Sequence, residues 1–491
     1  MSFRKQTGMK KNQYILLALL LLCALHVASG QDDSTQAPSG STQQPATPPA
    51  PAYGQEPATP PVSQGPPLTS LDEPALEPNI ATRSFLAPDI TVAEFADTNA
   101  SSALGGRRAW NGVTHLQGSL ALQRLWSRYE TDLQYGVGGT FYNNNVSATQ
   151  VHHLNFNQRF LWRTGSFQLR DTASYLPDGS FGFGSFGGAS LAGVGGFGGS
   201  GFGGGVGGIA GFPELGGSSF GGVGNIPRLH NLAMAEIQEN FSPRSSVTLA
   251  GGYGLLHFTE SAPGLIDSRQ VNGQAGYNYT ISRRSTIGTM YGYRAFSFPS
   301  QGGGSFRTHL VHLVYGYQLT GRLSLTLSGG PQLIRFSTPV NGSTHDVSGS
   351  GRAMLKYRFS ERTSMSFDYH HFTSSGSGFF AGAETDLVRL NATRQMGRLW
   401  TMTADIGYNH NRRLQNSAAG ADAVSYNSGY GGLRISRILR RTISAYAFYR
   451  YNDLVFSNSV CIAGTSNCGH SSNRNIIGLG LDWHPQPIRI D

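Results

Sequence analysis

Residues 269–298, RQVNGQAGYNYTISRRSTIGTMYGYRAFSF, contain two long segments in which apolar and polar positions alternate. In the first segment the residues of one parity are apolar: Val271, Ala275, Tyr277, Tyr279 and Ile281. This period of two is typical of a β-strand with one apolar and one polar face. The polar triplet Ser282-Arg283-Arg284 separates the segments. Each has roughly a dozen residues, enough for a tilted crossing of a bilayer. We therefore predict a transmembrane β-hairpin here.

The same unit recurs, with seventeen alternating segments between residues 113 and 484. Short polar turns, often carrying Arg, alternate with long connections between them. The long connections lie near 143–150, 177–227, 259–268, 299–305, 338–345, 375–384, 413–423 and 457–472. This alternation is typical of an outer-membrane barrel, with short turns in the periplasm and long loops outside. The sequence predicts an all-β fold, a single transmembrane antiparallel up-and-down β-barrel over residues 85–491.

The strand count needs one further segment, because single-chain bacterial barrels usually have an even number of strands. Segment 113–126 is followed by a short turn, so a strand of opposite direction must precede it. Residues 88–98, PDITVAEFADT, are the candidate. Including them gives eighteen strands, whereas placing 113–126 outside the wall gives sixteen. We predict 16–18 strands and favour 18.

The composition fits a barrel better than a bundle of membrane helices. The chain has 491 residues with 66 Gly, 21 Tyr, 27 Phe and only 13% charged residues, and its mean hydropathy is −0.25. A barrel keeps this average low because each lipid-facing residue alternates with a polar one facing the lumen. Tyr residues gather near both ends of the segments, as in the aromatic belts of membrane interfaces. A soluble β-sandwich or propeller is the rival interpretation.

Two segments precede the predicted barrel. Residues 1–30 join four basic residues to an apolar run that starts at Tyr14 and ends in small residues, which indicates a secretory signal peptide. A retained membrane anchor is the alternative, but the run is shorter than a membrane-spanning helix requires. Residues 31–84 are rich in Pro, Ser, Thr, Gln and Ala, and we expect a disordered periplasmic linker.

Three cysteines occur, of which Cys23 lies in the predicted signal peptide. We predict that Cys461 and Cys468, in a polar loop between the last two strands, form a disulfide, because an exported protein can oxidise such a pair. A metal site with His470 as third ligand is the weaker alternative, since a second pair of ligands is missing from the motif.

If the apolar parity faces lipid, the other parity faces the lumen and carries many charges. The predicted pore-lining residues are Arg159, Arg170, Arg294, Arg352, Lys356, Arg358, Arg389, Arg450, Asp368 and Asp405. Opposed cations and carboxylates across a constriction would set an electric field and a bias among solutes, and the somewhat basic wall favours small anions or polar solutes. The alternative for any one residue is pairing across neighbouring strands, which braces the sheet. The net charge of +9 also includes arginines at the turns, so nucleic-acid binding does not follow from it.

The connection 177–227 is dominated by Gly with interspersed Phe. Nucleotide binding is not predicted there, because the Lys-Ser/Thr pair of a phosphate loop is missing. We interpret the segment as an extracellular loop, either mobile outside or folded into the pore. Catalytic, cofactor and metal residues are not predicted, since His345, His370, His371 and His470 show no nucleophile with a nearby base. We therefore do not predict an enzyme.

The pair of segments GSLALQRLWSRYETDLQYGVGGTFYNN, residues 118–144, with the Arg-bearing turns that follow, resembles uncharacterised porin-like outer-membrane β-barrel proteins, especially those of acidobacteria. The resemblance implies a fold and a location without a substrate or a catalytic set. We hypothesise an outer-membrane channel for small polar or anionic solutes. The alternative is a non-conducting structural or adhesive barrel. Expected partners are outer-membrane lipid and lipopolysaccharide, the barrel-assembly machinery and small solutes, with homo-oligomerisation left open.

Overall fold

A computed structural model describes residues 67–70, 84–100, 104–105, 109–143, 148–176, 227–259, 265–299, 304–340, 342–376, 378–415, 424–461 and 468–490. All of them belong to one compact unit, residues 63–491. The predicted signal peptide, most of the Pro-rich segment and the Gly-rich connection lie outside the described residues. No helix among the described residues is long and apolar enough to cross a membrane.

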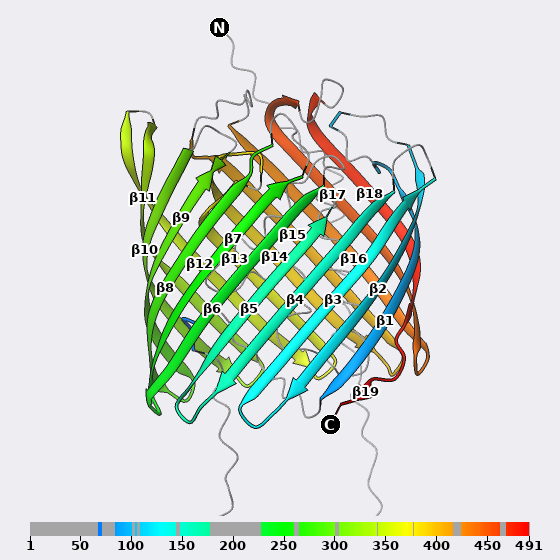
Figure 1. The fold of residues 1–491 in the computed structure, drawn as a ribbon, viewed down its shortest axis with the longest axis horizontal. Coiled ribbons are helices and arrows are strands. Elements are labelled where there is room, and N and C mark those ends of the chain that lie inside the picture. Colours follow the sequence, from blue (N-terminus) through cyan, green and yellow to red (C-terminus); the bar gives the residue numbers. More distant parts are fainter. Residues whose placement is uncertain are drawn as a thin grey trace, which may run out of the picture. The chain divides into compact units, whose positions relative to one another are not determined.

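The described chain forms nineteen strands, and the last of them has only two residues. Figure 1 shows the long strands arranged in a ring, each strand tilted against the barrel axis. The strands are β1 (Phe85–Asp97), β2 (Asn111–Leu125), β3 (Tyr129–Tyr142), β4 (Thr149–Leu161), β5 (Gly165–Leu176), β6 (Arg228–Ser242), β7 (Ser245–Phe258), β8 (Ser268–Ser282), β9 (Ser285–Phe298), β10 (Gly304–Thr320), β11 (Leu323–Val340), β12 (Ser343–Ser360), β13 (Thr363–Ser374), β14 (Ala383–Met396), β15 (Trp400–Arg413), β16 (Ser425–Arg440), β17 (Ile443–Cys461), β18 (Cys468–Trp483) and β19 (Ile488–Arg489).

The eighteen long strands close into one antiparallel barrel. Each pairs with its neighbour in the sequence, and β18 pairs with β1 from Ile90 opposite Trp483 to Asp97 opposite Ile476. The short β19 continues the pairing along the start of β1. Closure leaves no free sheet edge, which is the condition for a sheet to span a membrane. The prediction of eighteen strands is confirmed, and β1 is the strand inferred from residues 88–98.

The wall has an apolar outer face and a largely polar inner face. On β8, burial alternates strictly from Ser268 to Asn278, and the buried positions are Ser, Gln, Asn and Gly. The exposed positions of the same strand include Val271, Tyr277 and Tyr279. In a soluble protein the buried face of a sheet would be the apolar one. Here the buried face is polar and the exposed face is apolar, so the apolar face must meet lipid.

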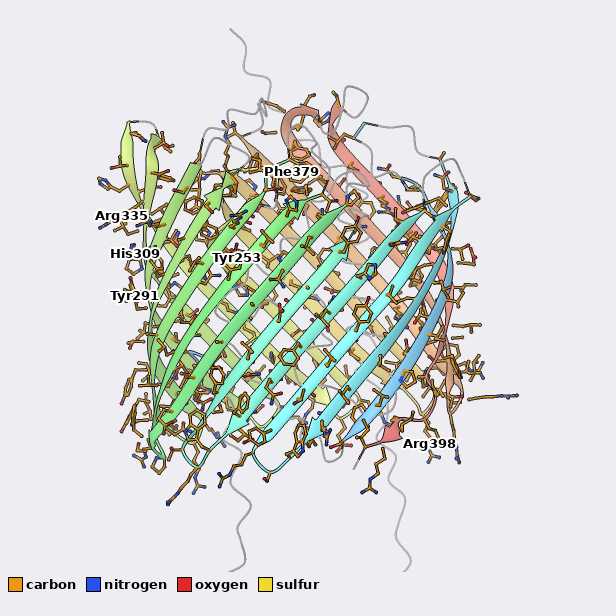
Figure 2. All side chains as sticks on the ribbon, viewed as in Figure 1. Tyr253, Tyr291, His309, Arg335, Phe379 and Arg398 are labelled. Atoms are coloured by element: carbon orange, nitrogen blue, oxygen red, sulfur yellow. The ribbon has the colours of Figure 1, made fainter. Side chains whose placement is uncertain are left out.

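Exposed aromatic residues lie at both ends of the outer face. Trp126, Trp162 and Trp400 are exposed beside the short turns, and Arg124 stacks on Trp126 with its guanidinium carbon 4.4 Å from the ring centre. Tyr253 is exposed in the upper part of the barrel in Figure 2, and Tyr291 is exposed near its mid-height. Two aromatic bands separated by aliphatic residues match the two interfaces of a bilayer.

Short and long connections alternate as predicted, with one correction. Three short turns are closed by serines, as where Ser282 Oγ accepts from the backbone N–H of Arg284 at 3.2 Å. The predicted long loop near 338–345 is wrong, because β11 runs to Val340 and pairs with Ser343 at the start of β12. The Asn341-Gly342 dipeptide is a strong signal for a tight hairpin, and Gly342 has φ +82°. The strands therefore continue where a loop was expected.

Candidate functional site: the barrel lumen

The structure places all ten predicted pore-lining residues on the inward parity of their strands. Five are buried: Arg170, Arg294, Arg352, Arg450 and Asp405. The other five are half-buried: Arg159, Lys356, Arg358, Asp368 and Arg389.

Two hairpins carry equivalent ion pairs inside the lumen. Arg352 of β12 binds Asp368 of β13 through Nη2–Oδ2 at 2.9 Å and Nε–Oδ1 at 3.2 Å. Arg389 of β14 binds Asp405 of β15 in the same way, at 2.6 and 3.2 Å. Each arginine reaches a carboxylate two positions along from its register partner. Such bidentate pairs fix both side chains against the wall.

Neighbouring polar side chains extend these pairs into a network. His370 Nε2 lies 2.9 Å from Asp368 Oδ1, the oxygen that also accepts from Arg352 Nε. The hydroxyl of Tyr430 on β16 donates to Asp405 at 2.9 Å. Arg159 and Glu130 are more exposed and lie 3.8 Å apart. Both aspartates among the ten predicted pore-lining residues bind arginines of the same group. These charges therefore brace neighbouring strands, as the alternative interpretation of single charges expects.

The seam between the first and last strands holds buried pairs that sequence reasoning left out of the predicted set. Arg474 of β18 donates from Nε to Asp97 of β1 at 2.8 Å. Arg434 of β16 binds Asp482 at 2.8 Å, and Thr91 donates to the other oxygen of Asp482 at 2.9 Å. The signal was available, because Arg434 shares the parity of the inward residues on its strand.

At the long-loop end the inward positions change from polar to apolar. The mouth cluster consists of buried residues from two groups of strands and three loops: Leu104, Ile266, Phe296, Phe298, Phe306, Ile334, Phe372, Phe379, Phe380, Ala381, Ala383, Leu387, Tyr426, Tyr430, Leu454, Phe456 and Val460. The aromatic rings are in contact, as with Phe296 and Phe306, whose ring centres are 4.6 Å apart. The described part of this end therefore holds two tightly packed apolar clusters.

One loop joins the two sides of the mouth cluster. The mouth loop, residues 375–382 between β13 and β14, carries Phe379, whose ring centre lies 5.2 Å from that of Phe456 on β17. The adjacent Gly378 lies against the ring of Phe258 on β7 and accepts a hydrogen bond from Ile266 at 2.8 Å. Strands β7 and β17 are on opposite sides of an eighteen-strand ring. The mouth loop therefore crosses the lumen, and Figure 2 shows Phe379 in the upper part of the barrel.

The mouth loop depends on glycine for its path. Gly376, Gly378 and Gly382 have φ of +83°, +87° and +92°, a conformation that other residues rarely adopt. We predicted a long extracellular connection near 375–384, and the structure instead turns it inward. The available signal was the Phe379-Phe380 pair, because two adjacent aromatic residues in a Gly-rich loop need a surface to bury them.

The adjacent residues His370 and His371 face opposite sides of the wall. His370 faces the lumen and contacts Asp368, whereas His371 faces outward and lies 2.8 Å from Asp386 and 3.3 Å from Glu384. On the same outer face, His309 lies 2.8 Å from the hydroxyl of Tyr291. Figure 2 shows both side chains at the edge of the barrel. These polar residues mark the outer interface beyond the aliphatic band.

The predicted cysteine pair lies at the tip of the last hairpin. Cys461 and Cys468 are opposite each other in the register of β17 and β18. Cys468 is disulfide-bonded.

Comparison with known proteins assigns no family to the chain. No family model matches the chain, and no curated protein matches it. It is similar in structure to the outer membrane protein OpdK of Pseudomonas aeruginosa, with 10% identity, a TM-score of 0.39, and coverage of 81% of this chain and 98% of that one. For OccK2 (OpdF) of the same organism the values are 9%, 0.41, 83% and 98%. For BauA, the ferric preacinetobactin receptor of Acinetobacter baumannii, they are 7%, 0.36, 82% and 80%.

Proposed function

We propose that this chain is an outer-membrane channel for the passive passage of small polar or anionic solutes. The observation that carries the proposal is a closed ring of eighteen long strands whose outer face is apolar and whose inner face is polar over most of its height. Barrels of this size enclose more space than their own wall residues fill. The short turns would then lie in the periplasm and the long connections outside the cell.

The ten inward residues predicted from sequence supply the selectivity in this proposal. Eight are cations and two are aspartates, and both aspartates already neutralise an arginine. The ten residues together keep a positive net charge, which favours anions. Strand β1 starts at the short-turn end, so the segment before it would enter from the periplasm, after removal of a signal peptide. Lipopolysaccharide, the assembly machinery and a homo-oligomer remain proposed partners on the outer face.

The mouth loop supports the second candidate, a barrel that does not conduct. It crosses the lumen and packs against facing walls, so the described mouth is filled along that line. A structural or adhesive protein could keep that arrangement permanently, whereas a channel needs a path beside the loop or a loop that moves.

Reversal potential in a salt gradient across a planar bilayer tests the proposal. The refolded full chain should carry current with anion preference. Replacing Lys356 and Arg358 with Gln should move the reversal potential toward zero, because both face the lumen. Arg283→Gln, in a short turn outside the wall, should leave it unchanged. Absence of current from all three proteins would reject the channel and favour the non-conducting barrel.

A further inference from the structure

The four residues Pro67–Ser70 lie against the lumen wall, far along the chain from the strands they touch. Thr69 is 1% exposed and Ser70 is 2% exposed. Their surroundings are the inward faces of β7, β8, β9 and β10 near the short turns. In Figure 1 this piece is the isolated dark-blue segment beside the lower part of those strands. We call it the arm segment.

A tight turn presents the middle of the arm segment to the wall. The backbone N–H of Ser70 donates to the carbonyl of Pro67 at 3.0 Å, which closes a four-residue turn. Leu68 and Thr69 are at its apex. Pro67 fixes its own φ and reduces the number of conformations open to the turn before it docks.

Every hydrogen-bonding group of Thr69 is met by a wall side chain. Its N–H donates to Asn278 Oδ1 at 3.1 Å, and its Oγ1 accepts from Asn278 Nδ2 at 2.6 Å. Its carbonyl accepts from Gln274 Nε2 at 2.6 Å and from Thr248 Oγ1 at 3.2 Å. Its hydroxyl also lies 2.6 Å from that of Thr248. Buried polar groups satisfied this completely indicate a specific fit rather than chance contact.

Three glycines make room for the arm segment. A Cβ at Gly276 of β8 would collide with Cβ and Oγ1 of Thr69. A Cβ at Gly316 of β10 would come within 2.7 Å of Leu68 Cδ2, and one at Gly288 of β9 would lie 3.3 Å from Thr69 Cγ2. All three glycines are inward positions, so they form a recess in the wall with the shape of the turn. We call it the glycine recess.

The chain is long enough for this docking. Fourteen peptide links separate Ser70 from Ser84, next to β1, and they can reach about 46–50 Å when extended. A circular ring of eighteen strands would be about 35 Å wide, given about 4.8 Å between strands and a tilt near 40°. The arm segment can therefore enter at β1 and reach β8 on the far side.

We propose that the glycine recess is a binding site for the chain's own arm segment, which narrows the lumen at its short-turn end. The recess recognises a turn by bonding one residue's N–H, carbonyl and hydroxyl together. The narrowing rests on the proposed channel function, whereas the docking does not.

Disulfide trapping tests the docking without any transport. In Leu68→Cys/Gly316→Cys, the sulfur at position 68 takes the place of Leu68 Cγ, 3.3 Å from where the Cβ of residue 316 is built, which is within disulfide reach. Diamide oxidation of the folded full chain, followed by peptide mass spectrometry, should give this cross-link in most molecules. Leu68→Cys/Gly273→Cys is the matched control, since Gly273 is on the outward parity of β8 and has open space around it. Equal cross-linking in both would overturn the docking.

Release of the arm segment tests the narrowing. Thr69→Pro removes the donated N–H and the hydroxyl without changing the wall, so barrel folding is not at risk, and Gly276→Val fills the recess from the other side. Added to Leu68→Cys/Gly316→Cys, either substitution should abolish the disulfide between positions 68 and 316. Without the two cysteines, either substitution should increase the conductance of the channel. A cross-link that forms as expected with no increase in conductance on release would overturn the narrowing. A cross-link without current from any protein would leave the docking in place and reject the channel.

Discussion

The two ends of the lumen are built from opposite chemistry on the same strands. On β17, Leu454 and Phe456 face inward near the long loops and pack in the mouth cluster, whereas Arg450 and Ser444 face inward lower down. The parity is constant along the strand. Only the residue type changes. Alternation therefore assigns the facing of a residue, while the residue type tells whether that level of the barrel is packed or polar.

Each end also receives a different segment of chain. The mouth loop enters from the long-loop end and buries Phe379 and Phe380 among aromatic rings. The arm segment occupies the short-turn end and is held by hydrogen bonds to Asn278 and Gln274. Apolar burial is non-directional and tolerates small shifts, whereas hydrogen bonds fix one register. The arm segment is therefore held in one register, whereas the mouth loop is held by packing.

Removing the aromatic pair of the mouth loop should have the largest effect. Phe→Ala in a packed core costs about 3–5 kcal/mol, and here the cost falls on a loop that the strand ladder does not need. Phe379→Ala/Phe380→Ala should therefore loosen the loop and raise the rate of liposome swelling in small polar solutes. Phe367→Ala, on the lipid face, is the control. Equal swelling rates for the double variant and the wild type would show that the mouth cluster does not limit passage.

Breaking a lumen ion pair should lower stability next most strongly. Asp405 is buried and binds Arg389, so Asp405→Asn leaves a guanidinium without its carboxylate and should cost about 3–5 kcal/mol. Urea unfolding in lipid vesicles, followed by tryptophan fluorescence, measures the loss. Glu361→Gln, in the short turn between β12 and β13, should change little. A similar loss in both variants would contradict a structural role for the buried pair.

Loss of an ion pair on the outer face should lower the stability of the barrel least. Arg412 binds Glu384 on the outward parity, but its side chain is 64% exposed. Exposed pairs contribute about 0–1 kcal/mol because water and salt screen them. Arg412→Gln should therefore leave the urea midpoint almost unchanged. A loss comparable to that of Asp405→Asn would mean that the outer pair is shielded in the membrane, and that the contrast between inner and outer charges is smaller than inferred.

The barrel and the facing of its residues could be predicted from sequence, because a period of two is a local property. Val271 and Asn272 report their faces without knowledge of any partner. The mouth loop could not be predicted in the same way, because Phe379 packs against Tyr426 and Phe456, which are distant in the chain and come close only in the folded barrel. The docking of Thr69 could not be predicted either, because its partners are also distant in the chain. Its partners Thr248 and Asn278 are 179 and 209 residues away, and its flanking composition predicts only a linker.

Single-channel conductance, measured for the wild type, Phe379→Ala/Phe380→Ala and Gly276→Val in identical bilayers, tests the central claim that the polar lumen is a solute path closed mainly at its mouth. We expect a resolvable current for the wild type, a moderate increase for Gly276→Val and the largest current for the mouth-loop variant. Silence from all three folded proteins, or an increase for Gly276→Val that exceeds that of the mouth-loop variant, would contradict it.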